Sequence, residues 1–382
     1  MPHLDGLVAP GFEAVADAFH ANFTERETLG AAVAVTLDGR PVVDLWGGVA
    51  APGIPWCQDT ATRIFSGGKA LVAVAMLMLV DDGRLDPHAP VAKYWPEFAA
   101  EGKGHVTVAE VMSHRARLPA VRGPVTYDDQ LDPVAMAARL AAQPQERGEH
   151  AVMNYHGYTI GWLADAIMRR VDGRSIGGFV AQEIAGPLGL DAWIGVPRHD
   201  LHRVADVTIA PELTVRPEWT HSPEVVEFIE AIWWNPPTWG TDAAHWNTAA
   251  WKRAEIPGVG AIATPRAMAR FYGALARGGE LDGVRLLSPE TLAFGRTELG
   301  RTVDVALGGA PLRYGFGLEL EAAPGALGPV ADAFGHAGAG GSIHVAWPSH
   351  GIGVSYAMND LQAGWPDRRR DALLNALLEC VA

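Results

Sequence analysis

The spacing of apolar residues near the start of the chain predicts a helix followed by two strands. Between Phe12 and Phe23 these residues recur every three or four positions, as on one stripe of a helix: Phe12, Val15, Ala16, Phe19 and Phe23. Two strand-like runs follow, Ala31 to Leu37 and Pro41 to Trp46. Asp38-Gly39 lies between them and is a dipeptide that favours a tight hairpin. We therefore expect the chain to open with a helix and an antiparallel hairpin.

The end of the chain has the same elements in the opposite order. Ser342 to Trp347 and Gly351 to Met358 are strand-like and are separated by a short turn that contains proline and glycine. Arg368 to Val381 has the pattern of a closing helix. The middle, from about Asp81 to Pro257, holds helical patterns and long loops rich in proline and tryptophan, with few convincing strands.

These patterns predict an α+β fold. Strands from the two ends can share one sheet only if the termini meet, so we predict an antiparallel β-sheet flanked by N- and C-terminal helices, with an inserted, mainly helical subdomain. The sheet subdomain would take about residues 1–80 and 258–382, and the insertion about 81–257, within a single module of residues 1–382. An active site is expected in the groove between the two parts.

Composition and charge exclude several kinds of partner. Of the 382 residues, 48% are hydrophobic and 19% are charged, which is enough to bury a large core. The formal net charge is −14, whereas binding to nucleic acid or to an acidic membrane needs a basic surface. The longest apolar run, Ala70 to Val80, is far shorter than the roughly 20 residues that cross a bilayer and predicts a helix buried on all sides. We expect no nucleic-acid or membrane partner, and the oligomeric state stays open.

Two further features bear on the cellular compartment. The chain begins Met1-Pro2-His3-Leu4-Asp5, without the basic start and apolar stretch of a secretory signal, so a cytoplasmic location is expected. Cys57 and Cys380 are too few for a disulfide framework in a chain of this length. Both are expected to be free thiols, since neither has sequence neighbours typical of a metal site or a catalytic thiol.

Ser66 and Lys69 are the first candidates for chemistry. They stand three positions apart in Phe65-Ser66-Gly67-Gly68-Lys69, just before the apolar run. At the start of a helix this spacing puts the hydroxyl and the amine on one face, so the amine could take the serine proton and make the oxygen nucleophilic. The S-x-x-K pattern is typical of serine acyl-transfer enzymes. The alternative is a helix-capping serine followed by an ordinary surface lysine.

Two other segments could complete such a site. Tyr155 lies in Asn154-Tyr155-His156-Gly157, before a helical stretch from Tyr158 to Val171, and could share a proton with Lys69 if the ammonium lowers the pKa of its phenol. The glycine-rich segment from Phe334 to Ser342 leads into a strand, so a ligand carbonyl could approach its backbone closely. Taken singly, these segments also fit a buried tyrosine and a flexible loop.

Together, the three segments resemble a known family. In order and spacing they are similar to the serine hydrolases related to class C β-lactamases and penicillin-binding proteins, and especially to family VIII carboxylesterases. The resemblance extends over most of the chain. Its further segments include Asp82-Gly83-Arg84-Leu85-Asp86, Val91-Ala92-Lys93-Tyr94-Trp95-Pro96-Glu97-Phe98, Gly102-Lys103, Ser113-His114-Arg115, Gly161-Trp162-Leu163, Pro187-Leu188-Gly189-Leu190, Arg253-Ala254-Glu255-Ile256-Pro257 and Gly335-His336-Ala337-Gly338.

The resemblance implies a role for each of these segments. Ser66 would be the nucleophile, Lys69 its base partner and Tyr155 the second proton carrier, with no metal or organic cofactor. His336-Ala337-Gly338 would take the place of the Lys-Thr-Gly strand motif of β-lactamases, and the backbone N–H groups of Ser66 and Ala339 would form the oxyanion hole. The implied activity is hydrolysis of small carboxylic esters, with acyl transfer or amide and β-lactam hydrolysis at the same site as alternatives, and a non-catalytic relative as a third.

The chain departs from the family pattern at four places. Gly67 and Gly68 replace bulkier residues, which should weaken the helix start by roughly 1 kcal/mol per glycine. Gly157 stands where β-lactamases carry an asparagine that contacts the substrate amide, and His336 where they carry a lysine that pairs with the drug's carboxylate. These two changes favour esters over lactams. Arg117 stands where relatives have glycine, and nothing in the sequence explains this change.

Other motifs are weaker. Gly173-Arg174-Ser175-Ile176-Gly177 fits the G-x-S-x-G nucleophile elbow, but Ser175 follows a helical stretch instead of a strand and is better explained as a helix N-cap. His199 and His202 form H-x-x-H without further metal ligands nearby and are interpreted as surface residues. His156 could line the pocket or pack beneath it.

Substrate preference is expected to lie in an aromatic stretch. Six of the 13 tryptophans fall between residues 219 and 251, in a loop-like region interrupted by Pro236-Pro237: Trp219, Trp233, Trp234, Trp239, Trp246 and Trp251. Rings of this size beside a groove would form an apolar wall for the acyl or alcohol group of a small or aromatic ester, and Trp233 and Trp234 are the chosen candidates. The alternative, that the rings simply hold a long loop in place, is expected to account for at least half of them.

Overall fold

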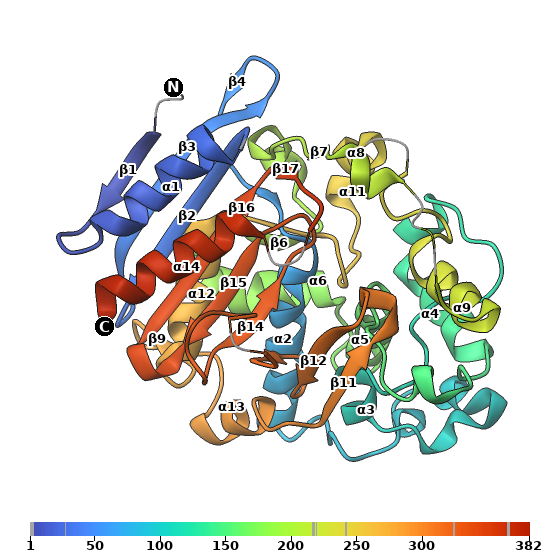
Figure 1. The fold of residues 1–382 in the computed structure, drawn as a ribbon. Coiled ribbons are helices and arrows are strands. Elements are labelled where there is room, and N and C mark those ends of the chain that lie inside the picture. The colour runs from blue at the N-terminus through green and yellow to red at the C-terminus, as the bar shows by residue number, and fades with distance from the viewer. Residues whose placement is uncertain are drawn as a thin grey trace.

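One antiparallel sheet collects strands from both ends of the chain (Figure 1). The structure, a computed structural model, describes residues 4–26, 28–215, 218, 220–240, 243–323, 325–364 and 367–382. In these ranges the sheet has ten strands, in the order β1-β3-β2-β16-β15-β14-β13-β12-β11, with β4 paired to β3. The strands are β1 (Leu4–Val8), β2 (Gly30–Leu37), β3 (Arg40–Ala51), β4 (Ile54–Pro55), β11 (Gly300–Asp304), β12 (Ala310–Tyr314), β13 (Glu319–Leu320), β14 (Phe334–Ala337), β15 (Ile343–Trp347) and β16 (Ile352–Met358).

The N-terminal and C-terminal hairpins meet at the centre of this sheet. β2 and β3 turn at Asp38-Gly39, where both residues have positive φ (49° and 79°), as the tightest hairpin turns require. β2 then pairs antiparallel with β16, with Val35 opposite Val354. The predicted joining of the two ends in one antiparallel sheet is confirmed.

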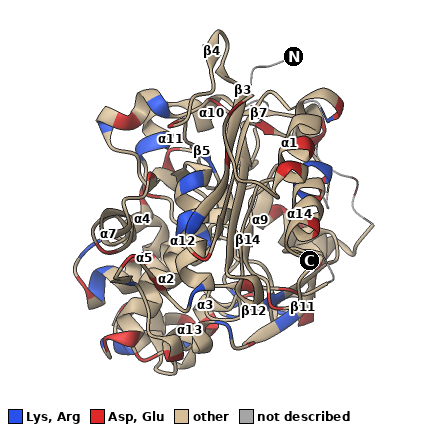
Figure 2. Ribbon diagram, turned by 90° about the vertical axis from the view of Figure 1, so that its left-hand side faces the viewer, with Lys and Arg blue, Asp and Glu red and all other residues tan. Residues whose placement is uncertain are grey.

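Helices cover both faces of the sheet (Figures 1 and 2). α1 (Glu13–Glu25) and α14 (Arg368–Val381), the two predicted terminal helices, lie on one face, and α12 (Pro265–Ala276) lies on the other. The α12 contact is very close, because a Cβ added at Gly353 of β16 would lie 2.2 Å from the backbone nitrogen of Gly273 in α12. Glycines at both positions thus allow the helix and the sheet to touch through their backbones.

The segment between the two sheet portions is mainly helical, and its helices extend beyond the insertion of about residues 81–257 that the sequence predicted. It begins with α2 (Lys69–Asp81), of which the residues from Lys69 to Leu77 and Leu79 are buried. The further α-helices are α3 (Val108–Met112), α4 (Pro133–Ala142), α5 (Thr159–Val171), α6 (Ile176–Phe179), α7 (Gly186–Leu188), α8 (Pro211–Thr214), α9 (Pro223–Trp233), α10 (Ala244–Asn247), α11 (Ala249–Arg253) and α13 (Pro289–Gly295). The short strands are β5 (Thr62–Arg63), β6 (Ala192–Ile194) and β8 (Ala261–Ala263) in one small sheet, β7 (Thr208–Ile209) with β17 (Asp360–Leu361), and β9 (Glu280–Leu281) with β10 (Val284–Arg285).

Two further expectations from the sequence can be compared with the structure. The run from Ala70 to Val80 forms most of α2 and is almost entirely buried, and none of the helices in the described ranges is long and apolar enough to cross a bilayer. Cys57 is exposed, Cys380 is half-buried, and both are free thiols, as expected. The α+β fold class is confirmed, while the exact boundary between the two subdomains stays a prediction.

Candidate active site

Ser66 lies in a tight turn that leads into the buried helix α2. The turn is the 3₁₀ segment η1 (Phe65–Gly68), and α2 begins at Lys69. Phe65 has a φ of +47°, a left-handed conformation that costs a residue with a side chain of order 1–3 kcal/mol. Its ring packs edge-on against Trp239 and Trp246, with centroid distances of 5.5 and 5.1 Å. These contacts hold the strained residue in place and thereby fix the direction of the neighbouring serine.

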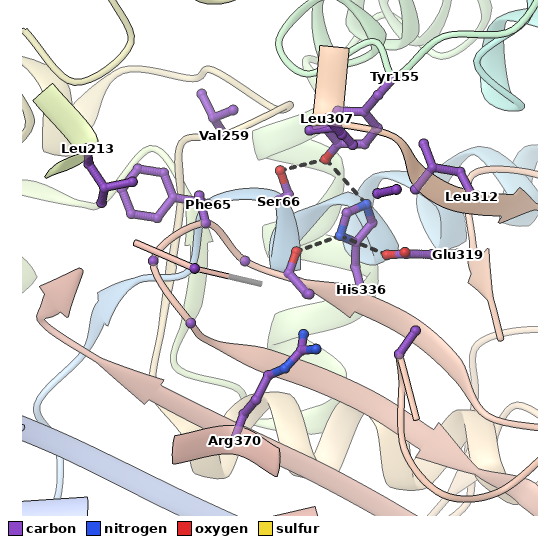
Figure 3. Close-up of a pocket in the computed structure, with 18 of the residues that line it drawn as sticks. Phe65, Ser66, Tyr155, Leu213, Val259, Leu307, Leu312, Glu319, His336 and Arg370 are labelled. Atoms are coloured by element: carbon purple, nitrogen blue, oxygen red, sulfur yellow. Dashed lines mark hydrogen bonds and ion pairs between the residues drawn. The ribbon is translucent and has the colours of Figure 1, made fainter. Parts of the chain in front are cut away.

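The hydroxyl of Ser66 lies between an amine and a phenol. Lys69 Nζ is 2.9 Å from Ser66 Oγ and 2.6 Å from the carbonyl oxygen of Gly258. The Tyr155 hydroxyl donates to Ser66 Oγ at 2.6 Å (Figure 3). All three side chains are buried. The residues that the sequence singled out as Ser66, Lys69 and Tyr155 are therefore together in one hydrogen-bonded cluster.

Burial decides the protonation states in this cluster. It lowers the pKa of Lys69 well below its usual value, with a smaller opposing effect from the charge of Glu319. Burial also raises the pKa of Tyr155 well above its usual value, and the hydrogen bond to Ser66 opposes this only in part. The expectation that an ammonium would lower the pKa of Tyr155 is wrong, because desolvation by burial has the largest effect on it and the nearby acids Glu319 and Asp304 act in the same direction. Burial thus disfavours the charged form of both side chains, the ammonium of Lys69 and the phenolate of Tyr155.

A buried carboxylate positions Tyr155. Asp304 accepts hydrogen bonds from the backbone N–H of Tyr155 at 2.6 Å and from the side-chain amide of Asn154 at 2.9 Å. The same carboxylate accepts from the backbone N–H of Ala306 at 2.8 Å, at the start of a short 3₁₀ turn. One acidic side chain thus ties the tyrosine segment to the sheet edge β11, from which residue 304 comes.

His336 lies next to Tyr155 and is a neutral imidazole. Burial lowers the pKa of His336 to about 3, and the charge of Lys69 acts in the same direction. Its Nδ1 lies 2.6 Å from the carbonyl oxygen of Ala337, which can only accept, so Nδ1 carries the proton. Nε2 then accepts from the Tyr314 hydroxyl at 3.0 Å and lies 3.4 Å from the Tyr155 hydroxyl.

Glu319 lies beside His336 (Figure 3). Its carboxylate oxygen is 3.4 Å from His336 Nδ1. Burial raises the pKa of Glu319 to about 7, although the charge of Arg370 and the backbone N–H of Ala337 favour its ionised form. The sequence pointed to neither Glu319 nor Tyr314, because they belong to no recognisable motif, and only the pairing of β13 with β14 brings Glu319 next to the histidine strand.

The glycine-rich segment after β14 lies against the Ser66 turn. A Cβ added at Gly338 would lie 2.4 Å from the carbonyl oxygen of Ile64, the residue before the turn. The Gly338 N–H donates to the carbonyl oxygen of Ser342 at 2.9 Å, which closes the loop. Gly338 and Ala339 both line the cavity that opens at Ser66. The segment packs closely against the Ser66 turn, and the approach of a ligand carbonyl to its backbone stays a prediction.

A large, mainly apolar cavity opens at Ser66. It has a volume of about 750 Å³, and the lining residues include Phe65, Tyr158, Leu213, Val215, Trp233, Trp234, Trp239, Val259, Leu307, Leu312 and Arg370. Of the six tryptophans proposed for its wall, Trp233, Trp234 and Trp239 line it, whereas Trp246 and Trp251 are buried beneath it and hold the loop. Trp219 lies outside the described residues. Some of these tryptophans therefore line the cavity and others hold the loop, while their effect on substrate preference stays a prediction.

Several other candidates have structural explanations. His156 is fully buried and does not line the cavity: its Nδ1 donates to the carbonyl of Asn154 at 2.6 Å and its Nε2 accepts from Leu118 N–H at 3.0 Å. Its assignment as a substrate-binding residue is therefore wrong. Ser175 caps α6 by accepting from Gly178 N–H at 3.1 Å, as predicted. His199 is exposed and lies 3.2 Å from Asp200.

The unusual glycines fit residues that are distant in the sequence. A Cβ added at Gly67 would lie 2.2 Å from the ring of His344, and one added at Gly68 would lie 2.1 Å from the Cβ of Ala261. The space that bulkier residues would take is therefore filled from β15 and β8. The expected loosening of the nucleophile turn does not follow, because both glycines are buried and closely packed.

Arg117 also has a backbone explanation. Its φ is +55°, the left-handed region that glycine adopts without cost. The family pattern of glycine at this position thus reflects the conformation of the chain there. The backbone N–H of Glu146 donates a hydrogen bond to the carbonyl oxygen of Arg117 at 2.8 Å, which holds the turn.

The fold and the serine, lysine and tyrosine cluster define a serine hydrolase of the carboxylesterase and β-lactamase type. The chain belongs to the Beta-lactamase family, which matches residues 12–379. It is 39% identical over 362 residues to the esterase/beta-lactamase LipL of Mycobacterium tuberculosis (strain ATCC 25618 / H37Rv), covering 92% of this chain and 82% of that protein.

Solved structures give the same result. A crystal structure of a family VIII carboxylesterase has a TM-score of 0.90 and 35% identity, covering 99% of this chain and all of that one. A penicillin-binding protein homologue from Caulobacter crescentus has a TM-score of 0.89 and 36% identity, with the same coverage. The resemblance noted from the sequence motifs is confirmed.

Proposed function

We propose that the chain hydrolyses apolar and aromatic carboxylic esters through an acyl intermediate on Ser66. The observation that carries this proposal is the cluster in which Ser66 Oγ lies 2.9 Å from Lys69 Nζ and 2.6 Å from the Tyr155 hydroxyl. A hydroxyl can give up its proton to an adjacent amine whose charged form is disfavoured by burial, and a phenol whose pKa is raised by burial is a suitable acid for a leaving alkoxide. The names of the two esterase relatives support an ester as the substrate.

The reaction uses these groups in turn. Ser66 Oγ attacks the ester carbonyl while Lys69 takes its proton, and the oxyanion is held by the backbone N–H groups of Ser66 and Ala339. The bond to the alcohol then breaks, and Tyr155 gives its proton to the departing alkoxide. The proton on Lys69 replaces the one lost by Tyr155, so the acyl-enzyme carries the same net charge as the free enzyme. Water repeats the attack and releases the acid.

The cavity supports apolar groups on the substrate. Its wall at Ser66 consists largely of aromatic and aliphatic side chains, and burial of such surface is favourable by about 25 cal/mol per Å². A neutral His336 offers no positive charge for a carboxylate beside the scissile bond. We therefore rank esters above β-lactams and expect at most slow turnover of a cephalosporin.

A set of p-nitrophenyl esters tests this function directly. Ser66→Ala should abolish hydrolysis of every ester that the wild type cleaves, and a phosphonate ester should label Ser66. Ser175→Ala is the matched control: it removes the α6 cap in the decoy G-x-S-x-G motif and should keep the activity. Full activity in Ser66→Ala, or labelling at Ser175, would refute the assignment. Added alcohols should compete with water for the acyl group if acyl transfer contributes.

A further inference from the structure

The ring of Trp233 occupies the space in front of Gly157. A Cβ added at Gly157 would lie 2.8 Å from Cη2 and 2.9 Å from Cζ3 of this indole. The backbone of Gly157 is outside the left-handed region, so it would accept a side chain if there were room. It is the tryptophan, 76 positions further along the chain, that excludes a side chain at this point.

Trp233 is held firmly in this place. Its Nε1–H donates to the carbonyl oxygen of Ala306 at 2.7 Å. Its ring stacks on that of Tyr155, with centroids 6.3 Å apart and an angle of 30° between the planes. Leu307 and Leu312 pack in the same cluster. Because its single N–H donor is already used, the indole presents only carbon atoms to the cavity beside Tyr155.

We propose that Trp233 and Gly157 together make this site selective for acyl groups that carry no amide close to the scissile carbonyl. The inference rests on the proposed esterase function and defines its acyl substrate class. An amide placed against the indole face would lose hydrogen bonds to water and gain none from this wall, whereas a hydrocarbon chain of the same length would lose nothing. The position that could hold an amide-binding side chain, residue 157, is filled by the apolar ring.

Two esters of equal chain length test this selectivity. In p-nitrophenyl hippurate an amide joins a phenyl ring to the acyl carbon, and in p-nitrophenyl 4-phenylbutanoate two methylene groups replace that amide. Each kcat/KM is divided by the second-order rate constant for direct attack of hydroxylamine on the same ester at neutral pH, which corrects for the difference in intrinsic reactivity without the base-promoted cyclisation of the hippurate. Leaving one or two polar groups unpaired should make the wild type prefer the phenylbutanoate by roughly ten- to hundredfold.

Variants assign the preference to this pair of residues. Gly157→Asn/Trp233→Ala restores both space and an amide group at position 157, and the preference should fall to near one. Gly157→Asn with Trp233 intact should lose activity on both esters, because the new side chain meets the ring. Trp234→Ala is the matched control, since this neighbouring tryptophan also lines the cavity, and it should leave the preference unchanged.

The outcomes separate this inference from the proposed function. A wild-type preference of one or less would overturn the inference without any variant, as would an unchanged preference in the double variant. If Gly157→Asn/Trp233→Ala is not labelled by the phosphonate ester, Gly157→Asn/Trp233→Leu takes its place, because leucine retains more of the buried apolar volume than alanine does. By contrast, hydrolysis of neither ester, or hydrolysis that survives Ser66→Ala, would refute the esterase proposal itself.

Discussion

Gly67→Ala should damage the nucleophile turn, and His344→Ala should repair that damage. The added methyl group would lie 2.2 Å from Cδ2 and 2.7 Å from Nε2 of His344. The imidazole has little freedom to move aside, because it is fully buried and its Nδ1 is hydrogen-bonded to Ser355 Oγ at 2.8 Å. Either the ring or the turn that carries Ser66 must therefore shift.

The size of the effect follows from two opposing contributions. Overpacking of a buried site typically costs about 1–3 kcal/mol. Alanine regains up to about 1 kcal/mol over glycine in helical conformation. We expect Gly67→Ala to lower the free energy of unfolding by about 1–2 kcal/mol. A shift of about 1 Å at Ser66 would also lower kcat/KM by as much as 100-fold.

A double-mutant cycle isolates the contact. His344→Ala alone destabilises the protein, since it leaves a cavity and removes the partner of the Ser355 hydroxyl. In that background the methyl group at residue 67 has room, so the two changes should be coupled by about 1–3 kcal/mol in a favourable sense. Urea unfolding measures the stability, and the rate of phosphonate labelling measures the reactivity of Ser66.

Gly104→Ala serves as the control for the loss of a glycine. Its added Cβ would find Ala99 Cβ at 3.7 Å, an ordinary contact, so it should change stability by a few tenths of a kcal/mol. If Gly67→Ala and His344→Ala change the free energy of unfolding additively, the imidazole of His344 is not what limits the space for a side chain at residue 67. Unchanged labelling by Gly67→Ala would show that the turn does not move.

Three further outcomes follow from the site. Tyr155→Phe should lower kcat by roughly 100- to 10,000-fold for alkyl esters, whose leaving groups need a proton, and less for p-nitrophenyl esters; equal losses in both series would argue against Tyr155 as the acid. Since the folded pKa of Glu319 is raised from 4.5 to about 7, the folded state holds the extra proton, and stability should fall by about 3 kcal/mol as the pH rises from 4.5 through 7. Urea unfolding at several pH values should show this loss in the wild type and not in Glu319→Gln; the same loss in both proteins would contradict it. Arg117→Gly should leave stability unchanged or raise it by up to about 1 kcal/mol, since it relieves a φ of +55°; a clear fall in the thermal midpoint would show that the side chain matters more than the backbone.

The elements at the two ends of the chain could be predicted from the sequence because their signals are local. Arg368–Val381 is helical over the predicted range, and the hairpin turns at Asp38-Gly39. The N-terminal and C-terminal segments share one sheet because β2 pairs with β16, and the mirrored order of their elements suggested this pairing. The short strand β8 and the close contact of α12 with the sheet have no such local pattern, since they depend on which residues happen to lie opposite each other.

Only those residues of the candidate site that belong to a recognisable sequence motif could be predicted. Ser66, Lys69 and Tyr155 stand in segments with a recognisable spacing, and the fold brings them within hydrogen-bonding distance. Tyr314 and Glu319 stand in no motif, although they surround His336 as closely as Tyr155 does. The pKa of Tyr155 was predicted in the wrong direction, because the sequence reveals a nearby lysine but not the depth of burial.

The glycines at positions 67 and 157 show that a single sequence does not reveal how closely the residues of a site are packed. In the sequence, Gly67 suggests a less stable helix start next to the nucleophile, and Gly157 suggests a missing contact to the substrate. In the folded chain each is the space for one large ring, His344 in the first case and Trp233 in the second. Neither ring is near its glycine in sequence, so neither pairing can be read from local pattern. A substitution at either glycine alone should therefore be harmful, and the harm should depend on the distant ring more than on the glycine itself.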